Sequence, residues 1–331
     1  MKITYYERHG NLDTYSIERL FRDIRSALPR SVNYRVATCR FESRGFWRRL
    51  YNTVEAIFKQ GEINHITGDV HYLAYLLRKK KTLLTIHDCS SLERLRGVRK
   101  WIYFYLWYWL PEKRSALISV ISESTRKELL RYLGCSPNKI RIVPDCVSPD
   151  FQPSQRVFNS LKPNILQIGT RYNKNLLRVA EALKGIPCHL MIVGRLSKEQ
   201  EDFLCKCNIE YSAVANIPNE ELAEMYDICD LVLFVSTYEG FGMPILEGNA
   251  IGRPVITSNI LSMPEVAGDA ACMVDPFNVE SIRDGILRII QDTEYRQTLV
   301  SNGYKNATKF KPEISAARYI ELYKELLEKE R

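Results

Sequence analysis

Hydrophobic and polar positions along the chain follow two alternating patterns. Short apolar runs at Ile3–Tyr6, Ile63–Ile66 and Leu83–Ile86 are typical of strands that are covered on both faces of a parallel sheet. Between such runs, apolar residues recur at helical spacing, from about Tyr15 to Leu28 and again from Phe46 to Phe58. This order of strands and helices predicts an α/β fold with a parallel, doubly wound sheet.

The second half repeats the alternation after a proline-punctuated stretch, residues 144–163, which is typical of a linker. Asn164–Ile168 and Leu231–Val235 are the clearest strands there. The 331 residues suffice for two domains of ordinary size. We therefore predict two domains, residues 1–150 and 151–312.

Charge is divided unevenly between the two halves. Residues 1–155 contain 27 Lys and Arg against 15 Asp and Glu, a net charge of +12, whereas the rest contain 20 against 24, a net charge of −4. Basic clusters occupy residues 44–49, 78–81 and 94–100, and the last leads into an aromatic run, 101–110. Two interpretations stay open: a solvated basic face with a buried aromatic helix, or a surface that binds anionic lipid head groups. No recognised nucleic-acid module accompanies the charge.

The sequence also bears on location. No signal peptide is visible, because Met1 leads at once into a polar-flanked strand. The aromatic run has about half of the ~20 residues that a bilayer span needs. Nine scattered cysteines without a C-x-x-C pair argue against a disulfide framework or a zinc site and fit a reducing compartment. We expect a cytoplasmic protein, with peripheral binding to the inner face of the membrane as an open alternative.

The segment from Leu231 to Glu247 predicts a strand, a glycine-bearing loop and the start of a helix. Gly240 and Gly242 flank Phe241 and let the backbone approach a ligand closely, and Pro244 suits the first helical turn. The free backbone N–H groups at such a helix start favour an anion such as phosphate.

Two carboxylates, Glu239 and Glu247, bracket this loop. Glutamate accepts hydrogen bonds from neutral hydroxyls, which distinguishes a sugar or a ribose from a plain phosphate. For Glu247 alone, the alternative is a carboxylate that complements the helix dipole. A second polar loop, 169–175, carries Arg171 and Lys174, which can neutralise a diphosphate; the alternative is a pair of ordinary surface cations.

Polar residues also follow strands in the first half. His65, Asp69 and His87 fall at the carboxyl ends of predicted strands, where parallel sheets bind ligands. A lone histidine is more often a hydrogen-bonded structural residue, so these three are candidates and not assignments.

The segment Ser236 to Pro276 closely resembles the donor-binding segment of the retaining family 4 glycosyltransferases, also described as glycosyl transferases group 1. The E-x7-E element is Glu239 with Glu247, followed by Gly252-Arg253-Pro254-Val255 and Pro264-Glu265-Val266-Ala267-Gly268. The resemblance implies the GT-B fold, in which two Rossmann-like domains with parallel sheets face a central cleft. It also implies that the last helix, 313–331, returns to the N-terminal, acceptor-binding domain.

The activity implied is that of a retaining hexosyltransferase, which moves a hexose from a nucleotide-diphosphate sugar to a hydroxyl of a glycan or lipid-linked acceptor. No cofactor is implied, and the sequence shows no Asp-rich cluster, so we expect no metal requirement. Within the same architecture, a nucleotide-sugar epimerase is the enzymatic alternative. A catalytically silent homologue that binds a membrane or a partner is the other.

The resemblance also implies roles for individual residues. Glu239 is expected near the donor sugar and Glu247 on the ribose hydroxyls, with His87 facing the sugar. The expected catalytic residues are His87, Glu239, Arg171 and Lys174. The expected donor-binding residues are Gly240, Phe241, Gly242, Met243, Pro244, Ile245, Glu247, Gly169, Thr170, Arg195 and Ile217. On the acceptor side the candidates are Gly10, His65 and Asp69; the glycine-rich turn of many members is here only His9-Gly10-Asn11.

Overall fold

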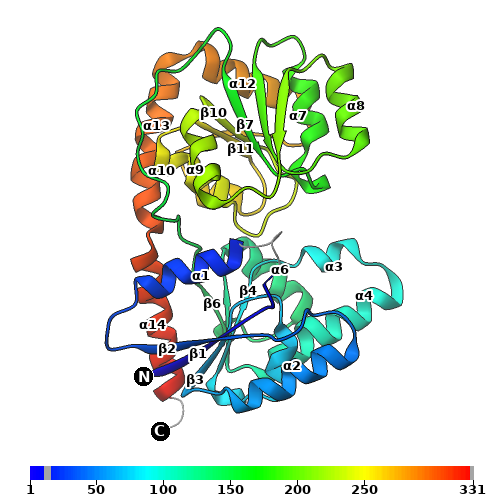
Figure 1. Ribbon diagram of the computed structural model, residues 1–331, viewed down its shortest axis with the longest axis vertical. Helices are drawn as coiled ribbons and strands as arrows, with labels where there is room; N and C mark the ends of the chain where they lie inside the picture. The colour runs from blue at the N-terminus through cyan, green and yellow to red at the C-terminus, as the bar shows by residue number, and fades with distance from the viewer. Residues whose placement is uncertain (11–15, 329–331) are drawn as a thin grey trace. The chain divides into compact units, whose positions relative to one another are not determined.

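A computed structural model describes residues 1–10 and 16–328. The chain forms two compact units, Met1–Cys146 with Pro312–Arg331, and Val147–Lys311 (Figure 1). It divides after Cys146 and again before Pro312, where the sequence predicts boundaries after residues 150 and 312. The first unit is therefore made from two separate stretches of chain.

The first unit contains a six-stranded parallel sheet in the order β2-β1-β3-β4-β5-β6. The direction of winding reverses between β1 and β3, so this is the switch point of the sheet. The strands are β1 (Lys2–Glu7), β2 (Asn33–Thr38), β3 (Ile63–Ile66), β4 (Thr82–Ile86), β5 (Leu117–Val120) and β6 (Ile140–Ile142). The helices are α1 (Ser16–Ser26), α2 (Phe46–Phe58), α3 (Ser90–Arg94), α4 (Gly97–Phe104), the π-helical segment η3 (Tyr105–Trp109), α5 (Leu110–Arg114), α6 (Glu123–Leu133) and α14 (Pro312–Glu328).

Helix α14 completes the core of the first unit. Its buried side chains Tyr319 and Tyr323 belong to the same cluster as Ile3 and Tyr5 of β1 and Phe21 of α1. The Tyr323 hydroxyl also donates to the hydroxyl of Tyr5 at 2.9 Å. The last helix is thus a structural part of the first unit.

The second unit also has six parallel strands, in the order β12-β11-β10-β7-β8-β9. Counted from β7, this is the strand order of dinucleotide-binding folds, and the switch point lies between β7 and β10. The strands are β7 (Asn164–Ile168), β8 (His189–Val193), β9 (Tyr211–Val214), β10 (Leu231–Phe234), β11 (Val255–Ser258) and β12 (Cys272–Val274). The helices are α7 (Leu176–Leu183), α8 (Lys198–Lys206), α9 (Asn219–Ile228), α10 (Met243–Ile251), α11 (Met263–Ala267), α12 (Val279–Gln291) and α13 (Thr293–Ala307).

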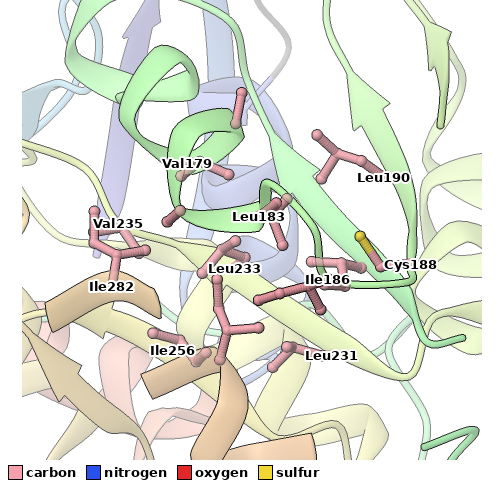
Figure 2. Close-up of a cluster of buried hydrophobic side chains, with 14 of the residues drawn as sticks. Val179, Leu183, Ile186, Cys188, Leu190, Leu231, Leu233, Val235, Ile256 and Ile282 are labelled. Carbon is pink, nitrogen blue, oxygen red and sulfur yellow. The ribbon is translucent and has the colours of Figure 1, made fainter. Parts of the chain in front are cut away.

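Strand β10 is covered on both faces, as its unbroken apolar run predicts. Leu231 and Leu233 pack with Val179 and Leu183 of α7 and Ile282 of α12 (Figure 2). On the other face α10 approaches so closely that a Cβ at Gly248 would lie 3.1 Å from a methyl of Val232. This packing fixes the start of α10 at the carboxyl end of β10.

All nine cysteines are free thiols, in agreement with their spacing. Among the helices of residues 1–10 and 16–328, none has the length and apolarity needed to cross a bilayer.

Candidate functional site

The loop after β10 is shaped by Gly242 and by a buried serine. Gly242 precedes α10 with φ of +118°, a conformation that side chains other than glycine rarely adopt. Pro244 occupies the first helical turn, and the Ile245 N–H donates to the Gly242 carbonyl at 3.0 Å. The Ser262 hydroxyl lies 3.0 Å from the Glu239 carbonyl and 2.8 Å from the Phe241 carbonyl. The start of α10 is therefore held at the switch point.

The loop after β7 is shaped by Gly169, whose φ is +89°. A Cβ there would lie 2.9 Å from Cγ and Cε of Lys174, so only glycine lets the lysine side chain cross this backbone. The Gln167 side-chain amide donates to the Lys174 carbonyl at 2.9 Å. Lys174 is thus positioned through both its backbone and its side chain.

The two loops meet in an ion pair. Lys174 Nζ lies 2.7 Å from Glu239 Oε1, and both side chains are largely shielded from solvent, with 18% and 16% exposed. The Asn173 amide donates to Glu239 Oε1 at 3.2 Å and to the Tyr238 carbonyl at 2.9 Å. Lys174 Nζ also lies 4.7 Å from the centre of the Phe234 ring. A cation and a carboxylate, 65 positions apart, are so brought together at the β7/β10 switch point.

The other expected donor residues surround this pair to different degrees. Arg171 precedes Lys174 by three positions, and its side chain is exposed. The Thr170 hydroxyl donates to the Arg195 carbonyl at 2.7 Å, so Arg195 enters the loop through its backbone while its side chain is exposed. Ile217 is half-buried, two positions before α9. Met243 is likewise half-buried, in the first turn of α10.

Glu247 is buried on α10 and has a partner that sequence reasoning missed. Its Oε2 accepts a hydrogen bond from the Tyr226 hydroxyl at 2.6 Å, and both residues are at most 3% exposed. Tyr226 comes from α9 and packs edge-on against Phe151 at 5.3 Å between ring centroids. The carboxylate is therefore oriented by a neighbouring helix and does not lie on an open surface.

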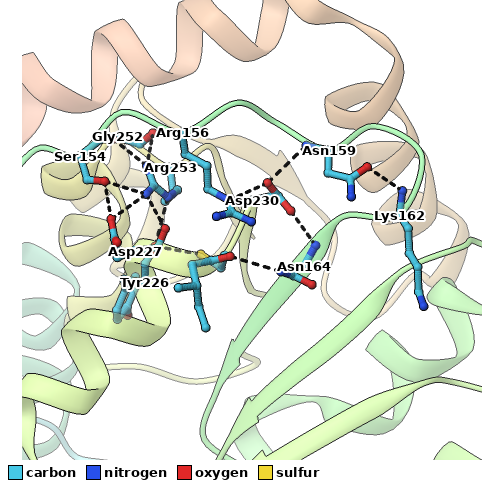
Figure 3. Close-up of polar contacts among 12 residues, drawn as sticks. Ser154, Arg156, Asn159, Lys162, Asn164, Tyr226, Asp227, Asp230, Gly252 and Arg253 are labelled. Carbon is cyan, nitrogen blue, oxygen red and sulfur yellow. Dashed lines mark hydrogen bonds and ion pairs between the residues drawn. The ribbon is translucent and has the colours of Figure 1, made fainter.

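Arg253, which belongs to the quoted family motif, supports this arrangement from the amino-terminal side of the sheet (Figure 3). Its guanidinium is buried and donates to the carbonyls of Tyr226 at 3.1 Å, Ser154 at 2.9 Å and Asp227 at 2.7 Å. These bonds fix the carboxyl end of α9, and with it Tyr226. Arg253 is thus a scaffold residue that is linked to Glu247 through two hydrogen bonds of Tyr226, one at its carbonyl and one at its hydroxyl.

Candidates in the first unit gather near its own switch point. The His87 Nε2–H donates to the Thr67 carbonyl at 2.9 Å, and burial lowers the pKa of His87, so the ring is neutral with Nδ1 as its acceptor. Asp69 is exposed and accepts a hydrogen bond from Trp107 Nε1 at 3.1 Å. Gly10 is exposed, and a Cβ there would meet nothing within 4 Å. Asn11 of the same turn lies outside the described residues.

His65 is placed differently from the expectation. It is fully buried, its Nδ1 lies 2.7 Å from the Tyr323 hydroxyl and its Nε2 lies 2.7 Å from the Thr85 hydroxyl. Burial holds the pKa of His65 well below its ordinary value. Because both ring nitrogens are occupied inside the core, the prediction that His65 contacts an acceptor is wrong; it joins α14 to the sheet instead.

No group of three or more His, Cys, Asp or Glu side chains that could hold a metal ion occurs within the parts of the chain that the structure describes.

Comparison with known families identifies the chain. The family described as "Glycosyltransferase Family 4" matches residues 18–151, and that described as "Glycosyl transferases group 1" matches residues 150–306. The chain belongs to glycosyltransferase family 4. Both halves of this family 4 glycosyltransferase are therefore accounted for, including the first, which the sequence motifs cover only loosely.

Two curated relatives are mannosyltransferases of Escherichia coli. The O-antigen chain mannosyltransferase B is 28% identical over 288 residues, which are 78% of this chain and 73% of that protein. The serotype-specific mannosyltransferase WbdA is 25% identical over 275 residues, which are 75% of this chain and 34% of that protein. The family 4 chain thus spans about a third of WbdA.

Solved structures show the same fold at low identity. HepE from Anabaena, solved with UDP and glucose, has a TM-score of 0.79 at 15% identity, over 98% of this chain and all of that one. WaaG, a glycosyltransferase involved in lipopolysaccharide biosynthesis, has a TM-score of 0.71 at 14% identity, over 96% of this chain and 98% of that one. The family 4 chain has the GT-B fold.

Sequence reasoning missed four supporting residues of this glycosyltransferase, namely Gln167, Asn173, Tyr226 and Ser262. Asn173 lies inside the quoted loop between Arg171 and Lys174, and Ser262 directly precedes a helix that starts with Met-Pro, where a serine is common. Those positions carried a usable signal. Tyr226 did not, because its partner Glu247 is 21 positions away on another helix. Gln167 did not either, because it lies inside a strand and bonds to the backbone carbonyl of Lys174, which no side-chain pattern indicates.

Proposed function

We propose that the second unit binds a nucleotide-diphosphate sugar at the β7/β10 switch point, and that the chain transfers its hexose to a hydroxyl of a glycan or lipid-linked acceptor. The observation that carries the proposal is the Lys174–Glu239 pair, at 2.7 Å, beside the start of α10. A cation, a helix start and a carboxylate at one switch point fit a ligand with both phosphate and hydroxyl groups. The names of the curated relatives favour mannose as the hexose.

The chemical difficulty is a diphosphate leaving group beside an oxocarbenium-like sugar. Lys174, Arg171 and the backbone N–H groups at the start of α10 would stabilise the charge that develops on the phosphate. Charged groups that are held in place before the reaction stabilise the transition state most effectively. Lys174 is held by hydrogen bonds with Glu239 and Gln167, and its side chain passes over Gly169, where no Cβ is in the way. Arg171, with its exposed side chain, would have to be ordered by the ligand.

The carboxylates would recognise hydroxyl groups. Glu239 is proposed to accept hydrogen bonds from the donor sugar, and Glu247, oriented by Tyr226, from the ribose. His87 is proposed to accept one at Nδ1 from the sugar. We further propose retention at the anomeric carbon without a carboxylate nucleophile, with the leaving phosphate helping to deprotonate the acceptor.

Two polar atoms support a ligand at this place. Gln167 Oε1 and the Ser236 hydroxyl are buried without a hydrogen-bond partner among the described residues, and they lie on β7 and just after β10. A buried polar atom that stays unpaired costs about 1–3 kcal/mol, so such atoms concentrate where a ligand or a water completes the structure.

A thermal-shift panel of UDP, GDP and ADP and their glucose and mannose conjugates tests the donor site, since a ligand that binds only the folded chain raises its melting temperature. We expect a shift with one base, and transfer from the mannose conjugate of that base. NMR of the product then reports whether the anomeric configuration is retained. Absence of a shift with every nucleotide would contradict the donor site, and turnover of donor without any acceptor would favour the epimerase.

A further inference from the structure

Helix α2 presents its large apolar side chains to the outside. Its inward face is small and polar: Asn52, Thr53 and Ala56 are the buried residues, and the Asn52 amide donates to the Phe41 carbonyl at 2.8 Å. The side chains on its outward face are Phe46, Trp47, Leu50, Tyr51, Val54, Ile57 and Phe58, of which Trp47 is 77% and Phe58 82% exposed. An amphipathic helix of a self-sufficient domain would show the opposite arrangement.

Helix α4 is similar. None of its residues is buried, and Val98, Trp101 and Ile102 are 75%, 69% and 53% exposed. The interpretation of the aromatic run as a buried helix therefore fails for its first half, while Trp107 and Tyr108 in η3 are buried. The rings of Trp101 and Tyr105 are stacked nearly parallel, with 6° between their planes and 6.1 Å between their centroids.

The two helices belong to one surface of the first unit. The Arg49 guanidinium of α2 lies 4.5 Å from the centre of the Trp107 ring, three residues beyond the end of α4. Tyr72 packs against Trp107, at 5.6 Å between ring centroids, and its hydroxyl accepts a hydrogen bond from the Asn52 amide at 3.1 Å and lies 3.0 Å from the Ser43 hydroxyl. Both helices pack on one hydrophobic cluster, which contains Ala56 of α2 and contacts Tyr103 and Phe104 of α4.

The charge around this surface is mostly positive. Residues 40–59 and 94–106 together contain nine Lys and Arg against two Glu. Arg44 and Arg48 stand next to Phe46 and Trp47, and Arg96 and Arg99 next to Val98, all with exposed side chains. Exposed aromatic residues rimmed by arginine match the interfacial and head-group regions of an anionic bilayer. The excess of basic over acidic side chains favours an anionic surface over a second copy of the same basic face, because like charges repel.

We propose that α2 and α4 dock this chain on an anionic membrane surface, with Trp47 and Trp101 at the level of the head groups and the neighbouring arginines on lipid phosphates. The docking surface lies in the first unit and needs none of the donor chemistry proposed for the second. Its failure and that of the donor site can therefore be told apart, because nucleotide binding is measured without lipid.

Flotation with vesicles tests whether binding depends on the charge of the lipid and of the protein surface. We expect binding to vesicles that contain phosphatidylglycerol, little binding to pure phosphatidylcholine, and weakening by salt. Replacing Arg44 and Arg48 by glutamine should lower the partition coefficient by about fivefold per charge. The matched control, Lys206→Gln with Lys305→Gln on exposed positions of the second unit, should leave it unchanged.

Quenching of tryptophan fluorescence by brominated lipid tests whether the exposed tryptophans contact the bilayer. The chain has four tryptophans, and Trp47 and Trp101 are the strongly exposed ones. We expect quenching with the wild type and its loss in the double variant Trp47→Phe with Trp101→Phe. The double variant should keep the circular dichroism spectrum and the nucleotide-induced thermal shift of the wild type. Binding equal for neutral and anionic vesicles, or no quenching on bound vesicles, would overturn the proposal. So would a dimer, seen by sedimentation, that Trp47→Ser abolishes, because α2 would then be an interface between copies.

Discussion

The two sheets use their switch points differently. At β7/β10, the side chains that follow the strands bind one another across two loops: Lys174 binds Glu239, and Asn173 binds Glu239 as well. Near β1/β3, the polar side chains that follow the strands form hydrogen bonds to structural groups of their own unit. His87 donates to a backbone carbonyl, and Asp69 accepts from a tryptophan.

A ligand site and a scaffold of the same architecture thus differ in how their polar side chains are paired. In the second unit the polar groups satisfy each other while keeping part of their surface accessible, so a ligand can join them. In the first unit, His65 shows the other outcome, in which burial and two hydrogen bonds leave a histidine nothing further to bind.

The largest expected effect concerns the ammonium group of Lys174. Lys174→Ala removes a cation that Glu239 holds in place beside the start of α10. We expect the rate constant of transfer to fall by about 10²–10³-fold, as for other preorganised charge-stabilising groups. Initial rates over a range of donor concentrations measure this. Lys184→Ala, which removes an exposed lysine from the same unit, is the matched control and should be silent. A comparable loss in both variants would remove the distinction between a prepared and an ordinary cation.

The next effect concerns Glu247 and its orienting tyrosine. Glu247→Gln keeps an acceptor for the Tyr226 hydroxyl but removes the charge, so we expect donor affinity to fall by about 10–100-fold, with the fold intact. Tyr226→Phe keeps the charge and loses one hydrogen bond, and should weaken donor binding by about fivefold. Titration calorimetry with the nucleotide sugar gives both. Equal affinity in all three proteins would place the ribose elsewhere.

In the first unit, His65 makes stability depend on pH. Its pKa is lowered in the folded chain, so below pH ~6.5 the unfolded chain binds a proton that the folded one does not, and stability falls as pH falls. The slope is about 1.4 kcal/mol per pH unit for one such group. Burial raises the pKa of Asp145 to about 8, which contributes the opposite slope over the same range. The measurement is therefore the difference in unfolding free energy between wild type and His65→Gln at pH 7.5 and pH 5.5, in urea.

We expect the deficit of His65→Gln to shrink at the lower pH by about 1 kcal/mol. A constant difference would mean that His65 titrates alike in the folded and unfolded chains, and that the first unit does not hold it as a core residue.

The smallest expected effect is that of metal removal. Glycosyl transfer after dialysis against EDTA should keep its rate to within about twofold, because charge stabilisation by Lys174 and a helix start is proposed to take the place that a metal takes elsewhere. Loss of activity that Mg²⁺ or Mn²⁺ restores would contradict this and would reduce the weight given to Lys174.

Sequence reasoning located the elements that have strong local signals. The helix Phe46–Phe58 and the strands Ile63–Ile66 and Asn164–Ile168 begin and end where their patterns predict. Strand β9, Tyr211–Val214, gave no signal, because it is an edge strand with three exposed residues and no apolar run. Strand β6 has only three residues, too few for a pattern to show.

In the candidate site, the predictable part was the part written in consecutive residues. The loops around Glu239 and Lys174 carry glycine, proline and charge in one stretch each, so their chemistry could be inferred. That Glu239 binds Lys174, or that Glu247 binds Tyr226, depends on which strands are neighbours, and the sheet order sets this. His65 was misplaced for the same reason, since its partner Tyr323 is 258 positions away.

Helix α14 has a consequence for the order in which the chain acquires its structure during synthesis. The residues of β1 leave the ribosome before those of α14, yet Tyr5 and His65 bond to Tyr323, and Ile3 packs in a cluster that contains Leu326. The second unit, Val147–Lys311, lies between these stretches and is complete in itself. At the usual synthesis rate of ~5–20 residues per second, the segment 147–311 would emerge and fold before α14, which packs on the first sheet, has been synthesised. The first unit thus begins before the second and is completed after it. Until α14 is synthesised, the apolar residues that it covers stay exposed, and a chaperone could bind them on the nascent chain.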